Sequence, residues 1–467
     1  MGGGDATWSE VPAELEAADP SEAADDTAER VTEGGTGTGA VTRGVAFRLA
    51  PLLTRILLGE GRDGREAADE LPIRVLAWDG SAIGPPGAPA FVVRHRRALR
   101  RLLWKPGEMG LVRAYVAGEL DIEGDLFAAL DAVQRVLRNG DEPIRLSGDD
   151  KRDIVRTAVT LGAVGPEPKP PPEELGTGRR GASNASNSSN DADTEPMKEP
   201  AAFFTRLLGD GLAHDTGEWD GAADLHDAQT AAHEAVAERL GLSPGARLLD
   251  LNCGWGAFAR HAAVHHGARV VALARTPEQA GHARGATADA DVEIRGFDLD
   301  EAGDGPYDAI VGLAGVAPID RPASRLRELL APGGRLVLRQ PVRRPGPNEA
   351  RRTFITGYLV PDDGEPRPLG ALVDDLEEAG LEVRAVAALR EDHARTLRAW
   401  AAGLRRHWTE CAELAGPGRA RVWLLYLAAS ALACESGQLG RHEILAIRRP
   451  HDARATADAA TVAVKPA

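Results

Sequence analysis

The sequence predicts an α/β protein with a doubly wound, Rossmann-like domain that follows a smaller N-terminal α+β domain. From about residue 199 to 450, short aliphatic and β-branched runs alternate with helical stretches, which is typical of a parallel sheet. One of these runs passes into a Gly-rich turn at residues 250–256. A Pro-rich and then Ser/Asn-rich segment separates this region from the N-terminal one, and 467 residues suffice for two hydrophobic cores.

The predicted order of segments follows from composition. Residues 1–42 are acidic, rich in Gly, Ala and Thr, and predicted to be a disordered tail. Residues 45–160 form the predicted N-terminal accessory domain, which binds lipid or a partner, and residues 163–198 form a disordered linker. Residues 199–450 form the α/β domain, and residues 451–467 are a second tail.

Periodicity predicts the elements of both domains. In the N-terminal domain we expect helices over 46–59 and 124–137, a strand with a turn over 72–81, and a strand that enters a helix over 90–104. In the α/β domain we expect five strands, RLLDL (247–251), RVVALA (269–274), VEIRGF (292–297), YDAIVGL (307–313) and RLVLRQ (335–340).

Composition excludes several classes of protein. A formal net charge of -16 argues against a general nucleic-acid binder, because phosphate contacts need a basic surface. Three Cys that lie far apart indicate neither a zinc cluster nor a disulfide framework, so we expect a reducing cytoplasm. The N-terminus lacks a secretory pattern, and no run of about 18 apolar residues predicts a membrane span.

The turn after the first strand of the α/β domain is the expected ligand site, because ligands bind beyond the carboxyl ends of parallel strands. Asp250 ends this strand, and Gly254 and Gly256 follow it. The dinucleotide pattern G-x-G-x-x-G is not met. An acidic residue followed by closely spaced Gly suits S-adenosylmethionine, whose carboxypropyl end needs close backbone approach and N–H donors at a helix N-terminus. The alternative is a tight structural turn.

Residues 237–284, which contain this turn, resemble the cofactor-binding half of the cyclopropane-fatty-acyl-phospholipid synthase family. The resemblance extends over about 45–160 and 199–450. Its further blocks are 71–81, 102–127, 307–313 with 329–340, 354–383, TLRAW (396–400) and RVWLLYL (421–427).

The resemblance implies a class I S-adenosylmethionine-dependent methyltransferase. Members of this family add the methyl carbon across a cis double bond of a phospholipid acyl chain. A bound bicarbonate then removes a proton to close a cyclopropane ring, whereas some relatives leave a methyl branch. The resemblance therefore implies lipid biosynthesis in the cytoplasm, with transient contact to the membrane that holds the acyl chains.

The same resemblance marks cofactor-binding positions. In the turn these are Asp250, Asn252, Cys253, Gly254, Trp255 and Gly256; Thr276 and Gln279 follow the second strand, and Asp298 follows the third. Asn252 replaces a family Gly, and Asn tolerates left-handed backbone angles. Helix capping and surface polarity are the alternative interpretation for Thr276 and Gln279, and a solvated loop carboxylate is the alternative for Asp298.

The catalytic set of the family is largely replaced. Ala317 and Pro318 stand where the family has a Glu-His pair, Thr216 replaces a Cys that helps to hold bicarbonate, and His393 replaces a Tyr. Bicarbonate is therefore left without several of its family ligands. His393 and Thr216, with Asp215 as a further candidate, are the residues that we expect to act in place of the lost groups. The alternative interpretation is that His393 is an ordinary surface or core histidine without a catalytic role.

Three functions stay open at this point. The first is a lipid methyltransferase of altered mechanism. The second is a catalytically silent paralogue that binds lipid, cofactor or an active partner subunit, and the third is a methyltransferase of another small molecule. A homodimer or pairing with an active family member is a predicted assembly.

Two further patterns concern membranes and metals. Residues 92–105 form a predicted basic amphipathic helix that could meet anionic headgroups, or could instead pair with acidic groups of the protein. Residues 202–212 could line the acyl entrance or pack as core. Five residues invite a metal interpretation, but their spacing fits no recognised site and we expect no metal there: His214, Asp215, His226, Asp227 and His233.

Overall fold

The computed structural model describes residues 44–58, 71–105, 108–138, 152, 156–175, 199–303, 305–313, 321–344, 357–359 and 366–450. The chain divides into two units, residues 1–174 and 175–467, which are considered separately. Within the described residues, no helix is both long and apolar enough to cross a membrane.

The first unit is an α+β domain, as predicted. Its four-stranded sheet has the order β2-β1-β3-β4, in which β1 and β3 are parallel and the outer strands are antiparallel. The strands are β1 (Arg74–Ala77), β2 (Ala82–Ile83), β3 (Ala90–Val93) and β4 (Leu120–Glu123). The helices are α1 (Val45–Leu58), α3 (Arg96–Trp104), α4 (Glu108–Val116) and α5 (Leu126–Arg138). The expected helices and strands of this domain are therefore confirmed.

Residues 163–174 differ from the expectation of a linker, because they pack within the first unit. Nη2 of Arg100 donates to the carbonyl of Val164 at 2.8 Å, and Nη1 of Arg101 donates to that of Lys169 at 2.7 Å. Arg113 forms an ion pair with Glu174 at 2.7 Å. Backbone carbonyls of a Pro-rich segment have few donors within the segment, so side chains of α3 satisfy them. Residues 176–198 lie outside the described part of the chain.

The second unit contains the predicted doubly wound sheet. Seven strands have the order β10-β11-β9-β8-β5-β6-β7, with β5 to β9 parallel and β11 antiparallel to both of its neighbours. The strands are β5 (Arg247–Asp250), β6 (Arg269–Ala274), β7 (Val292–Gly296), β8 (Tyr307–Leu313), β9 (Leu330–Arg343), β10 (Leu381–Ala388) and β11 (Leu439–Arg448). All five predicted parallel strands are present; β6 and β8 are largely continuous apolar runs, whereas β7 contains two charged residues.

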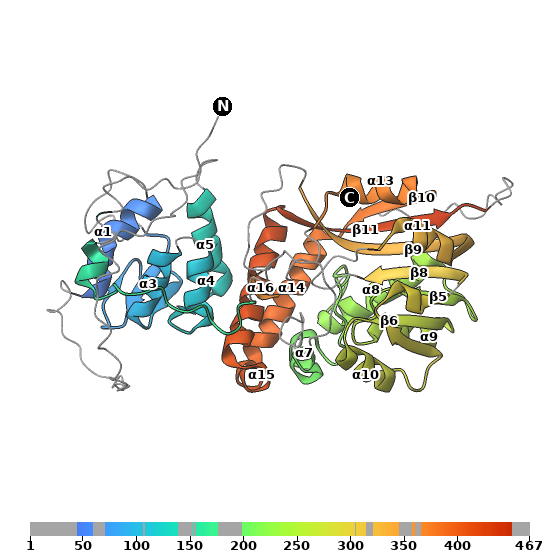
Figure 1. Ribbon diagram of the computed structural model, residues 1–467, viewed down its shortest axis with the longest axis horizontal. Helices are drawn as coiled ribbons and strands as arrows, with labels where there is room; N and C mark the ends of the chain where they lie inside the picture. The colour runs from blue at the N-terminus through green and yellow to red at the C-terminus, as the bar shows by residue number, and fades with distance from the viewer. Residues whose placement is uncertain are drawn as a thin grey trace, which may run out of the picture. The chain divides into compact units, whose positions relative to one another are not determined.

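Helices cover both faces of this sheet (Figure 1). Successive residues of β5 point to opposite faces of the sheet. Leu248 packs with α8 (Leu225–Leu240), α9 (Ala257–His266) and α10 (Pro277–Ala286). Leu249 packs instead with η3 (Leu299–Ala302), α11 (Ala323–Leu329) and α13 (Leu369–Glu378). Two buried clusters on opposite faces hold the strand ends in fixed positions.

A further group of helices contacts the start of β11. It consists of α7 (Ala201–Leu208), α14 (Arg390–Arg406), α15 (Trp408–Ala415) and α16 (Pro417–Glu435). Because β11 is antiparallel, its first residues lie at the edge where the parallel strands end, as the pairing of His442 with Gln340 of β9 shows. The helices therefore pack beside the edge where ligands of doubly wound sheets bind.

Candidate active site

The Gly-rich turn joins β5 to α9 in a compact hydrogen-bonded loop. The backbone N–H of Asn252 donates to Oδ1 of Asp250 at 3.1 Å, and that of Cys253 donates to the carbonyl of Leu273 in β6 at 3.0 Å. Gly254 and Gly256 have φ values of 53° and 94°. The turn needs Gly at these two positions, because other residues adopt such angles at a cost.

Asn252 is not in the left-handed region that the sequence analysis invoked for it. Among the described residues, Leu212 is the one non-Gly residue with a positive φ, at 47°. The two Gly residues of the turn carry the left-handed conformations instead, so Asn252 needs no special backbone angle. Its side chain is half-buried beside Asp250.

Burial changes the acidity of this turn. Asp250 is 1% exposed, and burial raises its pKa to about 7, although the N–H of Asn252 opposes the shift. Burial and the neighbouring Asp250 also raise the pKa of the Cys253 thiol above its usual value. Cys253 is therefore a neutral thiol at pH 7, and Asp250 exchanges a proton near neutral pH.

Two buried polar atoms beside the turn bind no described residue. These are Nε1 of Trp255 and Oε1 of Gln279, whose residues are 2% and 3% exposed. An unsatisfied buried polar atom is costly, so each of the two is expected to have a partner outside the described residues, such as a bound ligand. A Cβ on Gly254 would meet nothing within 4 Å, whereas one on Gly256 would lie 3.2 Å from Ala283. Open space at Gly254 and two unpaired polar atoms fit a polar cofactor in this turn.

Thr276 and Asp298 have local structural roles. Oγ1 of Thr276 accepts the N–H of Gln279 at 3.1 Å and caps α10, as the capping alternative predicted. Oδ1 of Asp298 accepts the N–H of Asp300 at 3.1 Å and caps η3, and Asp298 is exposed. Their assignment as cofactor ligands stays a prediction.

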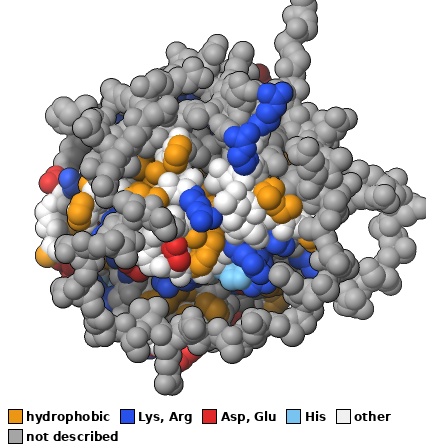
Figure 2. All heavy atoms as spheres, turned by 90° about the vertical axis from the view of Figure 1, so that its left-hand side faces the viewer, with side chains coloured by type: hydrophobic (Ala, Val, Ile, Leu, Met, Phe, Trp, Pro, Cys, Tyr) orange, Lys and Arg blue, Asp and Glu red, His pale blue; other side chains and the backbone are white. Residues whose placement is uncertain are grey.

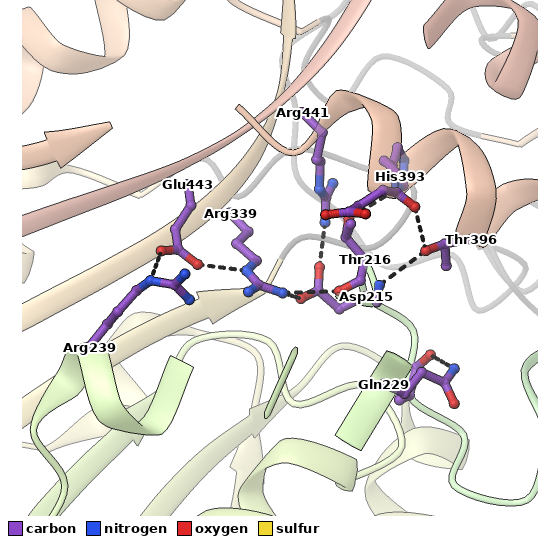
Figure 3. Close-up of polar contacts among 12 residues, drawn as sticks. Asp215, Thr216, Gln229, Arg239, Arg339, His393, Thr396, Arg441 and Glu443 are labelled. Atoms are coloured by element: carbon purple, nitrogen blue, oxygen red, sulfur yellow. Dashed lines mark hydrogen bonds and ion pairs between the residues drawn. The ribbon is translucent and has the colours of Figure 1, made fainter. Parts of the chain in front are cut away.

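The two candidate catalytic residues lie in direct contact. Oγ1 of Thr216 lies 2.9 Å from Nδ1 of His393 on α14, and both residues are buried (Figure 3). Thr396, one turn further along α14, accepts hydrogen bonds from the N–H of Gly217 at 3.0 Å and from Nε1 of Trp219 at 2.9 Å. The segment at 216–219 is thus held against α14 by side-chain hydrogen bonds.

A buried ion-pair network holds the same segment (Figure 3). Asp215 accepts from Arg339 and from Arg441, each at 2.8 Å. Glu443 pairs with Arg339 at 2.8 Å and with Arg239 at 3.0 Å. Three guanidinium groups and two carboxylates give this cluster a formal charge of +1. Although burial alone would raise the pKa of Asp215, Arg339 and Arg441 hold it below the usual value, so Asp215 is a charged acceptor.

Sequence reasoning missed this network. Arg339, Arg441 and Glu443 lie in β9 and β11, two strands that are otherwise largely apolar. Buried charges are paired, so a charged residue inside a predicted buried strand indicates an ion pair. This signal in the sequence could have identified the three residues.

His393 is a neutral imidazole in this environment. Its burial, together with the positive charge of Arg441, lowers its pKa to about 3. The ring is thus not a conventional general base with a pKa near 7, but its nitrogen lone pair stays unprotonated over the physiological pH range.

Aromatic contacts connect the turn to the Thr216–His393 pair. The rings of Trp255 and Phe204 lie 5.2 Å apart, Phe204 lies 6.2 Å from His214, and His214 lies 5.3 Å from Trp400 of α14. Phe204 belongs to α7, whose four buried residues pack as core, in agreement with that alternative for residues 202–212. Packed aromatic rings therefore lie between the turn and α14, which carries His393.

Ala317 and Pro318, the positions of the lost Glu-His pair, lie outside the described residues.

The basic helix α3 is mostly engaged within the first unit. Arg94 pairs with Asp121 at 3.0 Å, and Arg97 and Arg101 pair with Glu119 at 3.5 and 2.8 Å. Figure 2 shows Lys and Arg side chains scattered among hydrophobic and other side chains on the side of the molecule that it views. These contacts favour the alternative in which the helix pairs with acidic groups of the protein itself.

The five residues weighed for a metal have other roles. Asp215 lies in the ion-pair network, His214 contacts Trp400, and His233 contacts Phe258 at 5.6 Å. Asp227 caps the start of α8 with Asp224, and His226 is exposed.

Comparison with known proteins gives one family. Residues 199–444 match the family described as mycolic acid cyclopropane synthetase. A probable fatty acid methyltransferase of Mycobacterium tuberculosis is 30% identical over 82% of this chain and 92% of its own length. A probable fatty acid methyltransferase of Pseudomonas putida is 29% identical over 81% and 92%, respectively. A solved cyclopropane synthase of M. tuberculosis is 24% identical over 52% of this chain and 93% of its own, with a TM-score of 0.49.

Proposed function

The chain belongs to the mycolic acid cyclopropane synthetase family, and from this membership we propose that it methylates the double bond of unsaturated phospholipid acyl chains with S-adenosylmethionine as the donor. The product is a cyclopropane or a methyl-branched acyl chain. The observation that carries this proposal is the contact between Thr216 and His393, which restores a polar pair where two family residues are replaced.

The turn at 250–256 is the proposed cofactor site. The open space over Gly254 and the unpaired atoms of Trp255 and Gln279 support it. The N-terminus of α9, which has no side-chain cap, offers backbone N–H groups to a carboxylate. When bound, S-adenosylmethionine supplies an electrophilic methyl group. The carboxyl of Asp250 becomes a charged acceptor for a cationic ligand as the pH rises through about 7.

Thr216 and His393 are the proposed proton-handling pair. Methyl addition to an alkene leaves a cation on the acyl chain, and ring closure requires that one proton leave the added methyl group. Such a cation is a very strong acid, so a base with a pKa of about 3 is strong enough to accept the proton. In the tautomer with hydrogen on Nδ1, that N–H donates to Thr216 and the lone pair of Nε2 is available.

The protein excludes water from the region around the pair. Phe204, Trp255 and Trp400 are buried aromatic residues, and water would otherwise capture the cation. The ion-pair network holds residues 215 and 216 in one position, which fixes Thr216 relative to α14. Contact with a membrane surface and the assembly state stay predictions.

The second candidate is a catalytically silent paralogue, favoured by the replacement of the Glu-His pair by Ala317 and Pro318. Labelled methyl transfer separates the two candidates. Purified protein is incubated with methyl-labelled S-adenosylmethionine and vesicles of unsaturated anionic phospholipid, and cofactor binding is measured in parallel by calorimetry. Label in the acyl chains supports the enzyme, whereas cofactor binding without transfer supports the silent paralogue. Vesicles of fully saturated phospholipid are the control, because they offer no double bond.

A further inference from the structure

One glutamate and two histidines, residue types that bind metals, meet between α8 and α9. Glu234 lies on α8, and His261 and His266 lie on α9. Nε2 of His261 and Nε2 of His266 each lie 3.2 Å from the same atom, Oε2 of Glu234. The three ligand atoms all lie within 4.8 Å of one another.

These distances match a metal-binding geometry. Zinc binds imidazole nitrogen and carboxylate oxygen at about 2.0–2.1 Å in a tetrahedral arrangement. Neighbouring ligand atoms of such a tetrahedron are roughly 3.3 Å apart, because the edge is about 1.6 times the metal–ligand distance. Both N···O distances at Glu234 are close to this edge length. A metal ion therefore fits between the three side chains with small movements.

We propose that Glu234, His261 and His266 form a binding site for a divalent transition-metal ion such as Zn²⁺, with water in the remaining position. Two imidazoles and one carboxylate are a ligand set that suits Zn²⁺, and imidazole also suits Cu²⁺ and Ni²⁺. The site is independent of the proposed methyl transfer.

The exposure and the packing of the three side chains suit metal binding. Their side chains are 10% and 16% exposed, whereas that of Glu234 is 48% exposed, so an ion has access from solvent. The ring of His233 lies 5.5 Å from that of His261 and packs against it. The ring of His261 also stacks on Phe258 at 6.5 Å with an interplanar angle of 20°, which limits its rotation.

The position of the site suggests its consequence. Helices α8 and α9 flank β5 and the Gly-rich turn in the chain, and the metal ion would join the two helices directly. An ion that binds the folded state and not the unfolded chain raises the temperature of unfolding. We therefore expect the metal ion to stabilise the packing of α8 against α9.

The test uses the full chain after removal of metal with a chelator. Calorimetric titration with ZnCl₂ is expected to show one ion per chain, and Co²⁺ to give the absorption bands of a tetrahedral complex. Glu234→Gln is the sharpest variant, because an amide keeps a hydrogen bond to a histidine N–H but is a poor metal ligand. We expect Glu234→Gln, His261→Ala and His266→Ala each to weaken Zn²⁺ binding by at least about tenfold.

His226→Ala is the matched control, since His226 is an exposed histidine at the start of the same helix α8. It should bind Zn²⁺ as the unchanged protein does. Zn²⁺ should also raise the unfolding temperature of the unchanged protein and of His226→Ala, but not of Glu234→Gln. The proposal is overturned if the unchanged protein binds no stoichiometric Zn²⁺, or if Glu234→Gln and His261→Ala bind it with unchanged affinity. Circular dichroism confirms that each variant is folded.

Discussion

The hydroxyl of Thr216 lies 2.9 Å from Nδ1 of His393, although 177 residues separate them in the chain. The contact joins the segment after α7 to the first turns of α14. The family resemblance places Thr216 at the position of a Cys and His393 at the position of a Tyr, so the pair is the centre of the proposed chemistry.

Removal of the imidazole should abolish most of the activity. We expect His393→Phe to lower the rate of methyl transfer by about 10²-fold or more, because the proton then lacks its acceptor. Thr216→Val should cost less, since Thr216 positions the ring. The double variant should be no slower than His393→Phe alone, because the two act as one unit. Labelled methyl transfer measures all three, with His226→Phe as the control; an active His393→Phe would remove His393 from the mechanism.

Gln279→Met should weaken cofactor binding without loss of stability. Oε1 of Gln279 is buried and bonded to no described residue, so an apolar side chain of similar shape costs the free protein nothing. We expect about tenfold weaker binding of S-adenosylmethionine by calorimetry, the equivalent of one hydrogen bond.

The matched control for this prediction is Gln229→Met. Nε2 of Gln229 donates to the carbonyls of Leu208 and Ala213 at 3.1 and 3.0 Å. This variant should lower the unfolding temperature, because it leaves two buried carbonyls unsatisfied. Equal cofactor affinity in Gln279→Met and the unchanged protein would argue against the cofactor site.

The two Gly residues of the turn should respond differently to Ala. Gly256→Ala puts a Cβ 3.2 Å from Ala283 at a φ of 94°, and should cost about 1–3 kcal/mol of stability. At Gly254 the added methyl meets nothing within 4 Å, so the cost should be smaller. Gly254→Ala should instead reduce cofactor affinity more, because the methyl enters the proposed cofactor space. Thermal unfolding measures the stability of both variants, and calorimetry measures their cofactor affinity. A larger loss of stability in Gly254→Ala, or a larger loss of affinity in Gly256→Ala, would contradict the prediction.

Replacement of the buried Arg339 should lower the free energy of unfolding strongly. Arg339→Met takes one cation from between Asp215 and Glu443, and an uncompensated buried charge costs about 3–5 kcal/mol. Arg325→Met removes a pair with Glu328 whose side chains are 35% and 62% exposed, and should cost less than about 1 kcal/mol. Urea unfolding of both variants tests this difference, and similar costs would show that burial adds nothing to the Arg339 pairs.

Acid should destabilise the fold partly through His393. Its pKa is about 3 in the folded state and ordinary, near 6.5, in the unfolded chain, so the unfolded chain binds the extra proton first. This contribution is fully present above about pH 6.5 and is lost as the pH falls toward 3. Between pH 7 and 5 the unchanged protein should lose about 2 kcal/mol more than His393→Gln. Urea unfolding at both pH values measures this, and the exposed His226→Gln should follow the unchanged protein.

The local features of this protein could be predicted from sequence alone. The five parallel strands, the Gly-rich turn and the order of the two domains depend on periodicity and on residues a few positions apart, so a linear pattern contains them. Asn252 shows the limit of such reasoning, because the backbone angles of the turn were assigned to it and belong to Gly254 and Gly256. Residues 163–174 show it again, because side chains of α3, which lie far from them in the sequence, hold them in place.

The tertiary structure alone decided which side chains meet. Asp215 pairs with Arg339 and Arg441, 124 and 226 residues away, and Glu234 meets His261 and His266 on the next helix. Thr216 and His393, which the sequence analysis named as candidates from two distant segments, proved to be in contact. Such contacts depend on how helices and strands pack onto one another, and the spacing of residues along the chain does not specify that packing.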